Sequence, residues 1–413
     1  MALLICMVVG TAVFILGIHQ FQIRPLIPHL DSLRQGKNTY LVVGIFAGIL
    51  FPETESQYRA FDTVRYGFLN IGLIWFGLLL GLECSLRQLR KAQWYMVGGQ
   101  IASAGFIVSF AILSILASGS ILFLHLGLVS NLSLATLLCT CFVLSTRFPE
   151  PALRWRGRPT PPTPDPTPNL PTHNMIALCL LTFGFPFFAS NLTTTVGSFS
   201  FVGGFGLMTL IAGLGFLAGS CLDFALRTHR DPANGMATTC CILIFFAGLG
   251  QTLALPVLSV GFISGAWLIN TTVAKRALLE ALSRVDSVVT PLFYLFVGTL
   301  IGGYGGGVFA LWPPLLPLVA MILIVRTMGR TLGYSVSQYF WRVPEKWRDT
   351  LELSARPLGP LSVALAVQAL FLLDLDHNTL IAGLITSTIL SQITLFPPHD
   401  TTPIHRIASI PKD

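Results

Sequence analysis

Two similar eight-residue stretches place an arginine, a serine and prolines inside apolar parts of the chain. The first, LSTRFPEP, runs from Leu144 to Pro151, and the second, LSARPLGP, runs from Leu353 to Pro360. Such residues interrupt an apolar helix, and the backbone groups they release must face protein or water rather than lipid. A pair of interrupted apolar segments at corresponding places in two halves of a chain is typical of the binding site of a secondary transporter.

The polar groups of these stretches and of the segments next to them are the candidate substrate-binding residues. They are Ser145, Thr146, Arg147, Glu150, Thr182, Ser354, Arg356, Gly359 and Ser362. Because half-helix N-termini carry positive potential, a site that also holds Arg147 and Arg356 is cationic. Three interpretations stay open: the arginines cap broken-helix carbonyls in a protein that does not transport, they bind an anion or small organic acid, or a cation is exchanged for a proton.

Cation–proton exchange requires a group that titrates, and Glu150 is the candidate because it lies in the first interruption. A salt bridge between Glu150 and Arg147 is the alternative reading of this carboxylate. Arg326 and Arg330 also lie in an apolar segment, where an arginine costs about 2.5–3.5 kcal/mol near the bilayer centre. We expect Arg326 to compensate helix ends in the core, whereas Arg330 can extend towards the interface.

The composition indicates a polytopic membrane protein. Hydrophobic residues make up 53% of the 413 residues, and charged residues make up 10%. Thirteen apolar spans are predicted, at 2–19, 38–52, 64–84, 93–117, 132–156, 173–190, 197–226, 235–250, 252–270, 286–303, 313–340, 346–373 and 377–397. With the N-terminus outside and the C-terminus in the cytoplasm, 19 of the 25 lysines and arginines fall in cytoplasmic segments. Only Arg59 and Arg65 fall outside, as the positive-inside rule requires.

The two interrupted spans are the fifth and the twelfth, so they cross the membrane in opposite directions. This predicts an all-α fold of two inverted repeats with a pair of crossing discontinuous helices. Residues 1–190 form the first repeat, interrupted near 145–151, and residues 233–413 form the second, interrupted near 354–360. Residues 191–232 contain the connecting seventh span.

Several stretches resemble the monovalent cation:proton antiporter superfamily, which includes the sodium/proton exchangers and Kef-type potassium efflux systems. They are YLVVGIFAGILFP (40–52), GLIWFGLLLGLE (72–83), LSTRFP (144–149), FAGLGQTLALPVLSVGFISGAWLIN (246–270) and TPLFYLFVGTLIG (290–302). The resemblance implies sodium or potassium exchange for protons by alternating access. It also implies a homodimer in a bacterial inner membrane.

One departure from that family concerns the helix after the first interruption. In the family this helix carries acidic residues near the midplane, but residues 173–190 contain none, and Phe183 and Gly184 stand where an aspartate is expected. Thr182 is the remaining polar side chain there that we expect to touch an ion.

Other function classes find no support in the sequence. Motifs of serine hydrolases, zinc proteases, P-loop proteins and intramembrane aspartyl proteases are absent, so we expect a transporter with no catalytic residues, metal or cofactor. The net charge of +7 comes from cations spread between apolar runs, which indicates a lipid bilayer rather than nucleic acid as the partner. The eight cysteines are interpreted as packing residues.

Overall fold

The computed structural model describes residues 38–50, 55–86, 94–125, 132–145, 172–189, 201–228, 232–272, 275–303, 312–341 and 360–373. Throughout these ranges the regular structure is helical, which confirms the all-α part of the predicted fold class. The helices are α3 (Asn38–Leu50), α4 (Glu55–Leu82), α6 (Trp94–His125), α7 (Leu132–Leu144), α9 (Thr172–Ala189), α10 (Phe201–Thr228), α11 (Pro232–Thr252), α12 (Val257–Thr271), α13 (Lys275–Gly303), α15 (Trp312–Trp341) and α17 (Pro360–Leu373). The spans predicted at 2–19 and 377–397 lie outside the described residues.

These helices fall on the predicted apolar segments, but several ends differ: α4 already begins at Glu55 rather than at 64, and α6 continues to His125 rather than ending at 117. The tenth span was predicted to begin at residue 286, but α13 already begins at Lys275, so Asp286 lies within a helix rather than at its start. Among the described residues, two segments are long and apolar enough to cross a membrane, Thr63–Leu82 and Gly203–Thr228, and seven shorter apolar helices accompany them. Thirteen spans and a repeat remain predictions.

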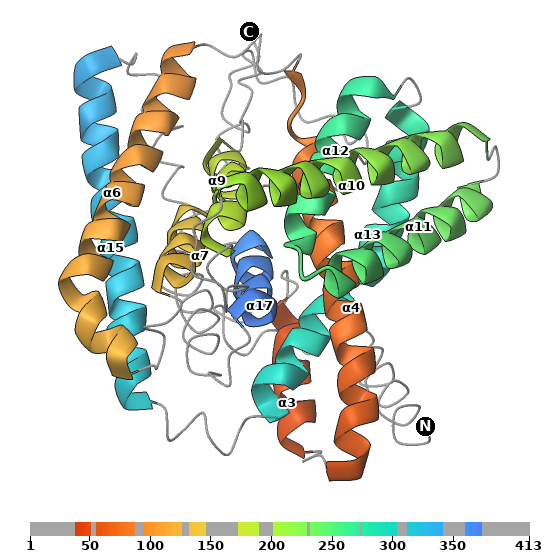
Figure 1. Cartoon of the computed structure of the whole chain (residues 1–413), viewed down its shortest axis with the longest axis horizontal. Helices are drawn as coiled ribbons and strands as arrows, with labels where there is room; N and C mark the ends of the chain where they lie inside the picture. Colours follow the sequence, from red (N-terminus) through yellow and green to blue (C-terminus); the bar gives the residue numbers. More distant parts are fainter. Residues whose placement is uncertain are drawn as a thin grey trace, which may run out of the picture.

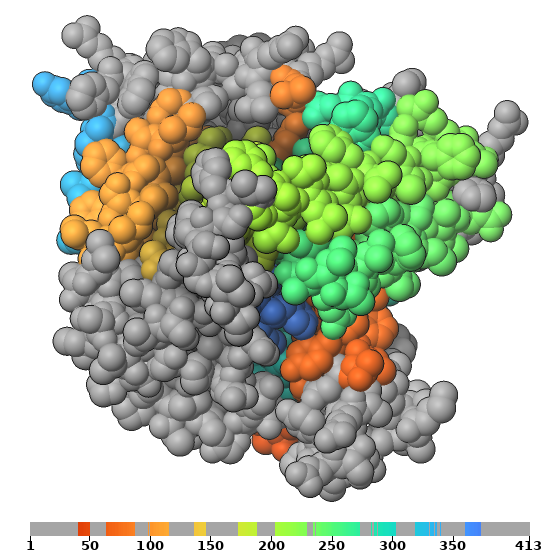
Figure 2. Space-filling model, in the orientation of Figure 1, coloured from red at the N-terminus to blue at the C-terminus, as the bar shows by residue number. Residues whose placement is uncertain are grey.

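The described helices form two groups that lie side by side (Figure 1). The α6 group contains the long antiparallel pair α6 and α15 together with the shorter α7, α9 and α17. The α4 group contains α3, α4, α12 and α13, with α10 and α11 projecting beside them (Figure 2). The two groups touch where α9 packs on α10 and where α17 packs on α4.

Within the α4 group, two helix pairs pack through glycines spaced four residues apart. In the pair of α3 and α13, a Cβ on Gly44 would overlap the Leu295 carbonyl oxygen, and a Cβ on Gly298 would overlap that of Leu41. In the pair of α4 and α12, Gly77 lies in the same way against Leu258. The sequence therefore allows the backbones to approach more closely than larger residues would permit, as at small-residue interfaces of membrane helices.

The glycines that complete these pairs repeat the pattern one turn further on. They are Gly48 and Gly302 in the first pair, and Gly81, Gly261 and Gly265 in the second. α6 and α15 also meet at small residues, because Gly333 lies against Ser103 and Gly329 against Ile107. Contacts between residues far apart in the sequence thus hold the described helices together.

Candidate functional site

The end of α7 inside the protein is the centre of the candidate site. α7 ends at Leu144, at the start of the first interruption, and Ser145 follows it with a fully buried side chain. The Ser145 hydroxyl donates a hydrogen bond to the Phe142 carbonyl at 2.7 Å, and its N–H donates to the Cys141 carbonyl at 3.2 Å. Ser145 therefore closes the last turn of the helix, but the final carbonyls still need donors from elsewhere.

Arg326 of α15 supplies such donors. Its Nη1 lies 2.9 Å from the Val143 carbonyl oxygen and 2.5 Å from that of Ser145, and its side chain is fully buried. The C-terminal end of a helix carries partial negative charge, so a buried guanidinium there both satisfies carbonyls and offsets the helix dipole. This is the geometry that the expected charge compensation by Arg326 needs.

The second interruption leads into α17, which packs against α7. α17 begins at Pro360, a favourable first helical residue because its fixed φ suits the helix and its missing N–H would have no helical partner there. Ser362, in the first turn, is fully buried. Within the described residues, α7 contains 13 residues and α17 contains 14.

α9 contributes the buried hydroxyl of Thr182 to the same group of helices. Thr182 is 4% exposed, and its Oγ1 has no hydrogen-bond partner, whereas the next residue, Phe183, points outward and is 52% exposed. Gly184 then lies against Leu137 of α7, so α9 and α7 are in direct contact. Thr182 of α9 and Ser362 of α17 thus lie on helices that pack against α7, and Arg326 of α15 binds the carbonyls at its end.

The other predicted site residues lie outside the described residues. They are Thr146, Arg147, Glu150, Ser354, Arg356 and Gly359.

A buried polar cluster lies at the start of α9. The Ser103 hydroxyl of α6 and His173 Nε2 are 2.7 Å apart, and Thr172 Oγ1 donates to Gln100 Oε1. His173 and Asn174 are both buried. The sequence alone indicated only a histidine at a helix start, because the contact with α6 joins residues 70 positions apart.

Two charged residues differ from the sequence interpretation. Arg65, counted among the outside cations, is only 1% exposed within α4, and its guanidinium carbon lies 5.5 Å from the centre of the Tyr66 ring. Asp286, at the predicted start of the tenth span, accepts hydrogen bonds from Trp75 Nε1 at 3.1 Å and from Thr290 Oγ1 at 2.6 Å. The spacing of Asp286 and Thr290, one helical turn apart, was a sequence signal for a helix through residue 286.

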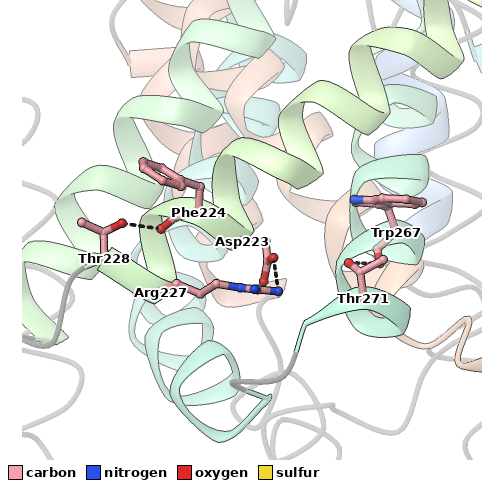
Figure 3. A network of polar contacts seen from close by, with 6 residues as sticks. All are labelled: Asp223, Phe224, Arg227, Thr228, Trp267 and Thr271. Atoms are coloured by element: carbon pink, nitrogen blue, oxygen red, sulfur yellow. Dashed lines mark hydrogen bonds and ion pairs between the residues drawn. The ribbon is translucent and has the colours of Figure 1, made fainter.

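A more exposed ion pair lies near the C-terminal end of α10. Arg227 Nη2 is 2.6 Å from Asp223 Oδ2, and the Arg227 side chain is 52% exposed (Figure 3). Thr228 and Thr271 each donate back to a carbonyl four residues earlier in their own helix. This network stabilises the helix ends locally and does not involve the end of α7.

Within the described ranges, no group of three or more His, Cys, Asp or Glu side chains is arranged to hold a metal ion. A scan against models of known protein families finds no match for this chain, and a search of curated proteins finds no similar sequence.

Proposed function

We propose that this chain is an integral membrane secondary transporter that exchanges a monovalent cation, sodium or potassium, for protons by alternating access. The observation that carries the proposal is the end of α7: a short helix that stops at Leu144 inside the protein and is capped there by the buried guanidinium of Arg326. Discontinuous helices whose ends lie in the protein interior surround the substrate in many secondary transporters.

The surface of α10 supports a membrane location. Large apolar side chains along this helix are exposed, including Phe205 at 47%, Leu217 at 58% and Phe224 at 72%. Neighbouring α11 exposes Ile244 and Phe245 in the same way. In water such an apolar surface would favour association or aggregation, whereas in a membrane it can contact the lipid chains directly.

The glycine pairs support the inverted repeat. The segment VVGIFAG (42–48) of α3 resembles SVGFISG (259–265) of α12, and FGLLLG (76–81) of α4 resembles VGTLIG (297–302) of α13. In the structure α3 packs on α13 and α4 packs on α12, so each helix pairs with one from the other half. If α3 corresponds to α12 and α4 to α13, the pair of α3 and α13 corresponds to the pair of α12 and α4. A twofold pseudo-symmetry axis relating the two halves would produce this correspondence.

The same exchange relates the helices of the α6 group. α6 would correspond to α15 and α7 to α17, and each of these pairs is in contact. The substrate would bind where α7 and α17 meet, between groups from Ser145, Thr182 and Ser362. Movement of the α6 group against the α4 group would then expose this place to each side of the membrane in turn, with Glu150 as the proposed proton carrier.

The lack of an acidic residue in α9 favours a second candidate, a carrier of anions or small organic acids. In this case Arg147 and Arg356 would bind the substrate, and no carboxylate would need to titrate.

Transport assays with purified protein in liposomes distinguish the two functions. We expect an inward sodium or potassium gradient to drive proton efflux, followed by a pH dye trapped in the liposomes, and Glu150→Gln to abolish the pH dependence of exchange. Arg227→Gln, at the exposed ion pair of α10, serves as the matched control and should transport like the wild type. Uptake of radiolabelled organic anions without any cation-driven proton flux would replace the exchanger with the anion carrier.

A further inference from the structure

Three fully or nearly fully buried polar side chains from three helices have atoms without hydrogen-bond partners. They are Asn70 of α4 at Nδ2, Ser259 of α12 at Oγ and Gln368 of α17 at Nε2, with exposed fractions of 2%, 0% and 0%. Buried polar groups without partners are rare, so each such group indicates strain, a function, or an ion or water that completes it.

The contacts of Gln368 place it at the N-terminal end of α12. Its Oε1 accepts a hydrogen bond from the Leu258 N–H at 3.1 Å, across 110 residues of sequence. Ser259 is the next residue along α12. The helix begins at Val257 after Pro256, and no side chain of Pro256 caps it. Gln368 therefore binds to the end of the helix that carries partial positive charge.

On α4, the residues one turn before and one turn after Asn70 contact α17 and α12, respectively. One turn before it, the Tyr66 ring packs on Phe371 of α17, with ring centres 5.5 Å apart. One turn after it, the Ile74 carbonyl lies against Gly261 of α12. Phe371 lies three residues after Gln368, so the contact between Tyr66 and Phe371 places the part of α17 that carries Gln368 near the part of α4 that carries Asn70.

The groups at this level favour negative charge. The hydrogen bond from Leu258 fixes the orientation of the Gln368 amide, so the atom left over is a nitrogen that can only donate. The positive end of α12 adds to this donor, and Asn70 and Ser259 can add two more. The surrounding Leu255, Val257 and Leu258 are buried and apolar, which strengthens electrostatic interactions and disfavours an unpaired donor.

We propose that Asn70, Ser259 and Gln368 bind a small monovalent anion, a halide or a carboxylate, at the N-terminal end of α12. The proposal does not depend on the transported substrate, because it rests on residues other than those around the end of α7. The C-terminal end of α17 bears the partly buried Phe371 and Leu372, and part of α17 is visible at the surface between α11 and α4 (Figure 2).

The test is a titration of the thermal unfolding temperature of the purified protein with sodium chloride, bromide or formate. Sodium concentration and ionic strength are held constant with sodium gluconate, whose anion is too large for a site of this kind. We expect a saturable rise in the unfolding temperature, since a ligand that binds only the folded state stabilises it. A rise with halides alone identifies a halide site, and a rise with formate identifies a carboxylate site.

Two nearly isosteric variants place a carboxylate at the site. Asn70→Asp and Gln368→Glu should each weaken the apparent anion affinity by about tenfold or more, the loss expected when a hydrogen bond to a charged group is removed. Ser264→Ala is the matched control, because Ser264 is equally buried on α12 and also has an unpaired Oγ, but it lies against Gly219 of α10. This control should titrate like the wild type.

Equal responses to all anions, or unchanged titration of both carboxylate variants, would overturn the proposal. If the variants do not fold, bromide-soaked crystals of the wild-type protein decide the question. An anomalous scattering peak beside Gln368 supports a halide site, formate density there in a separate formate soak supports a carboxylate site, and only water or nothing in both rejects the proposal.

Discussion

At the scale of single residues, the contact between Arg326 and the end of α7 joins a fully buried guanidinium to two carbonyls at a helix end. One guanidinium nitrogen serves two carbonyl oxygens that belong to residues more than 180 positions earlier in the chain. A buried carbonyl that loses its only donor costs about 1–3 kcal/mol. The same contact fixes α15 to the break in α7, so it affects both stability and the geometry of the candidate site.

We predict that Arg326→Met lowers the free energy of unfolding by about 2–5 kcal/mol, since two buried carbonyls lose their donor. Arg326→Lys should recover part of this loss because it keeps the charge and one donor group. Arg227→Met is the control, and it should change stability by less than about 1 kcal/mol because its ion pair is largely exposed. Denaturant unfolding in detergent measures all three, and equal effects of Arg326→Met and Arg227→Met would contradict the prediction.

The sequence could predict Arg326 as a core residue, because an arginine in an apolar segment must find a partner. It could not predict the burial of Arg65, since a cation near a span end can equally extend to the interface. Asn70 and Gln368 are similar cases: each is a lone amide in an apolar segment. The hydrogen bond from Leu258 to Gln368 depends on the packing of α12 against α17, which no local pattern contains.

At the scale of elements, apolar segments bounded by polar and proline-rich stretches correctly predicted where helices form. α9, predicted at 173–190, spans Thr172–Ala189, and α15, predicted at 313–340, spans Trp312–Trp341. The sequence did not predict which helices pair. Glycine spacing marked several faces as suitable for close contact, but the choice of α12 as the partner of α4 is a tertiary property.

The glycine pairs give a second prediction. Gly77→Ala and Gly298→Ala should each destabilise the protein by about 1–3 kcal/mol, because the new methyl group would overlap the backbone of the facing helix. Gly105→Ala in α6 is the matched control: its Cβ would meet no atom within 4 Å, and alanine favours the helix. Similar losses for Gly77→Ala and Gly298→Ala are expected if the two pairs are related by the repeat.

These losses can be measured by unfolding in detergent or by the fraction of protein that stays monodisperse after heating. A Gly105→Ala variant as unstable as Gly77→Ala would mean that helix contacts do not determine the effect. If Gly77→Ala lowered the stability and Gly298→Ala did not, the α4–α12 and α3–α13 pairs would not be equivalent. The packing argument for a repeat would then be lost.

At the scale of the whole molecule, orientation decides whether the two halves are inverted. α7 and α17 belong to the fifth and twelfth predicted spans, and an odd difference in span number makes them antiparallel. The predicted count agrees with the positive-inside rule, since it would place 19 of the 25 lysines and arginines on the cytoplasmic side. An error of one span anywhere between α7 and α17 would make these two helices parallel and exclude an inverted repeat.

We therefore predict that the N-terminus lies outside and the C-terminus in the cytoplasm. A reporter fused after Asp413 should be active only as a cytoplasmic reporter, and one fused after Thr228, at the end of α10, should give the same result because the seventh span also ends inside. A fusion within the segment between α11 and α12, near Leu253, should instead report the outside. A cytoplasmic signal at Leu253 would mean that the segment between α11 and α12 lies inside. The predicted directions of α4 and α12 across the membrane would then be opposite, which is incompatible with their pairing as parallel helices from opposite halves.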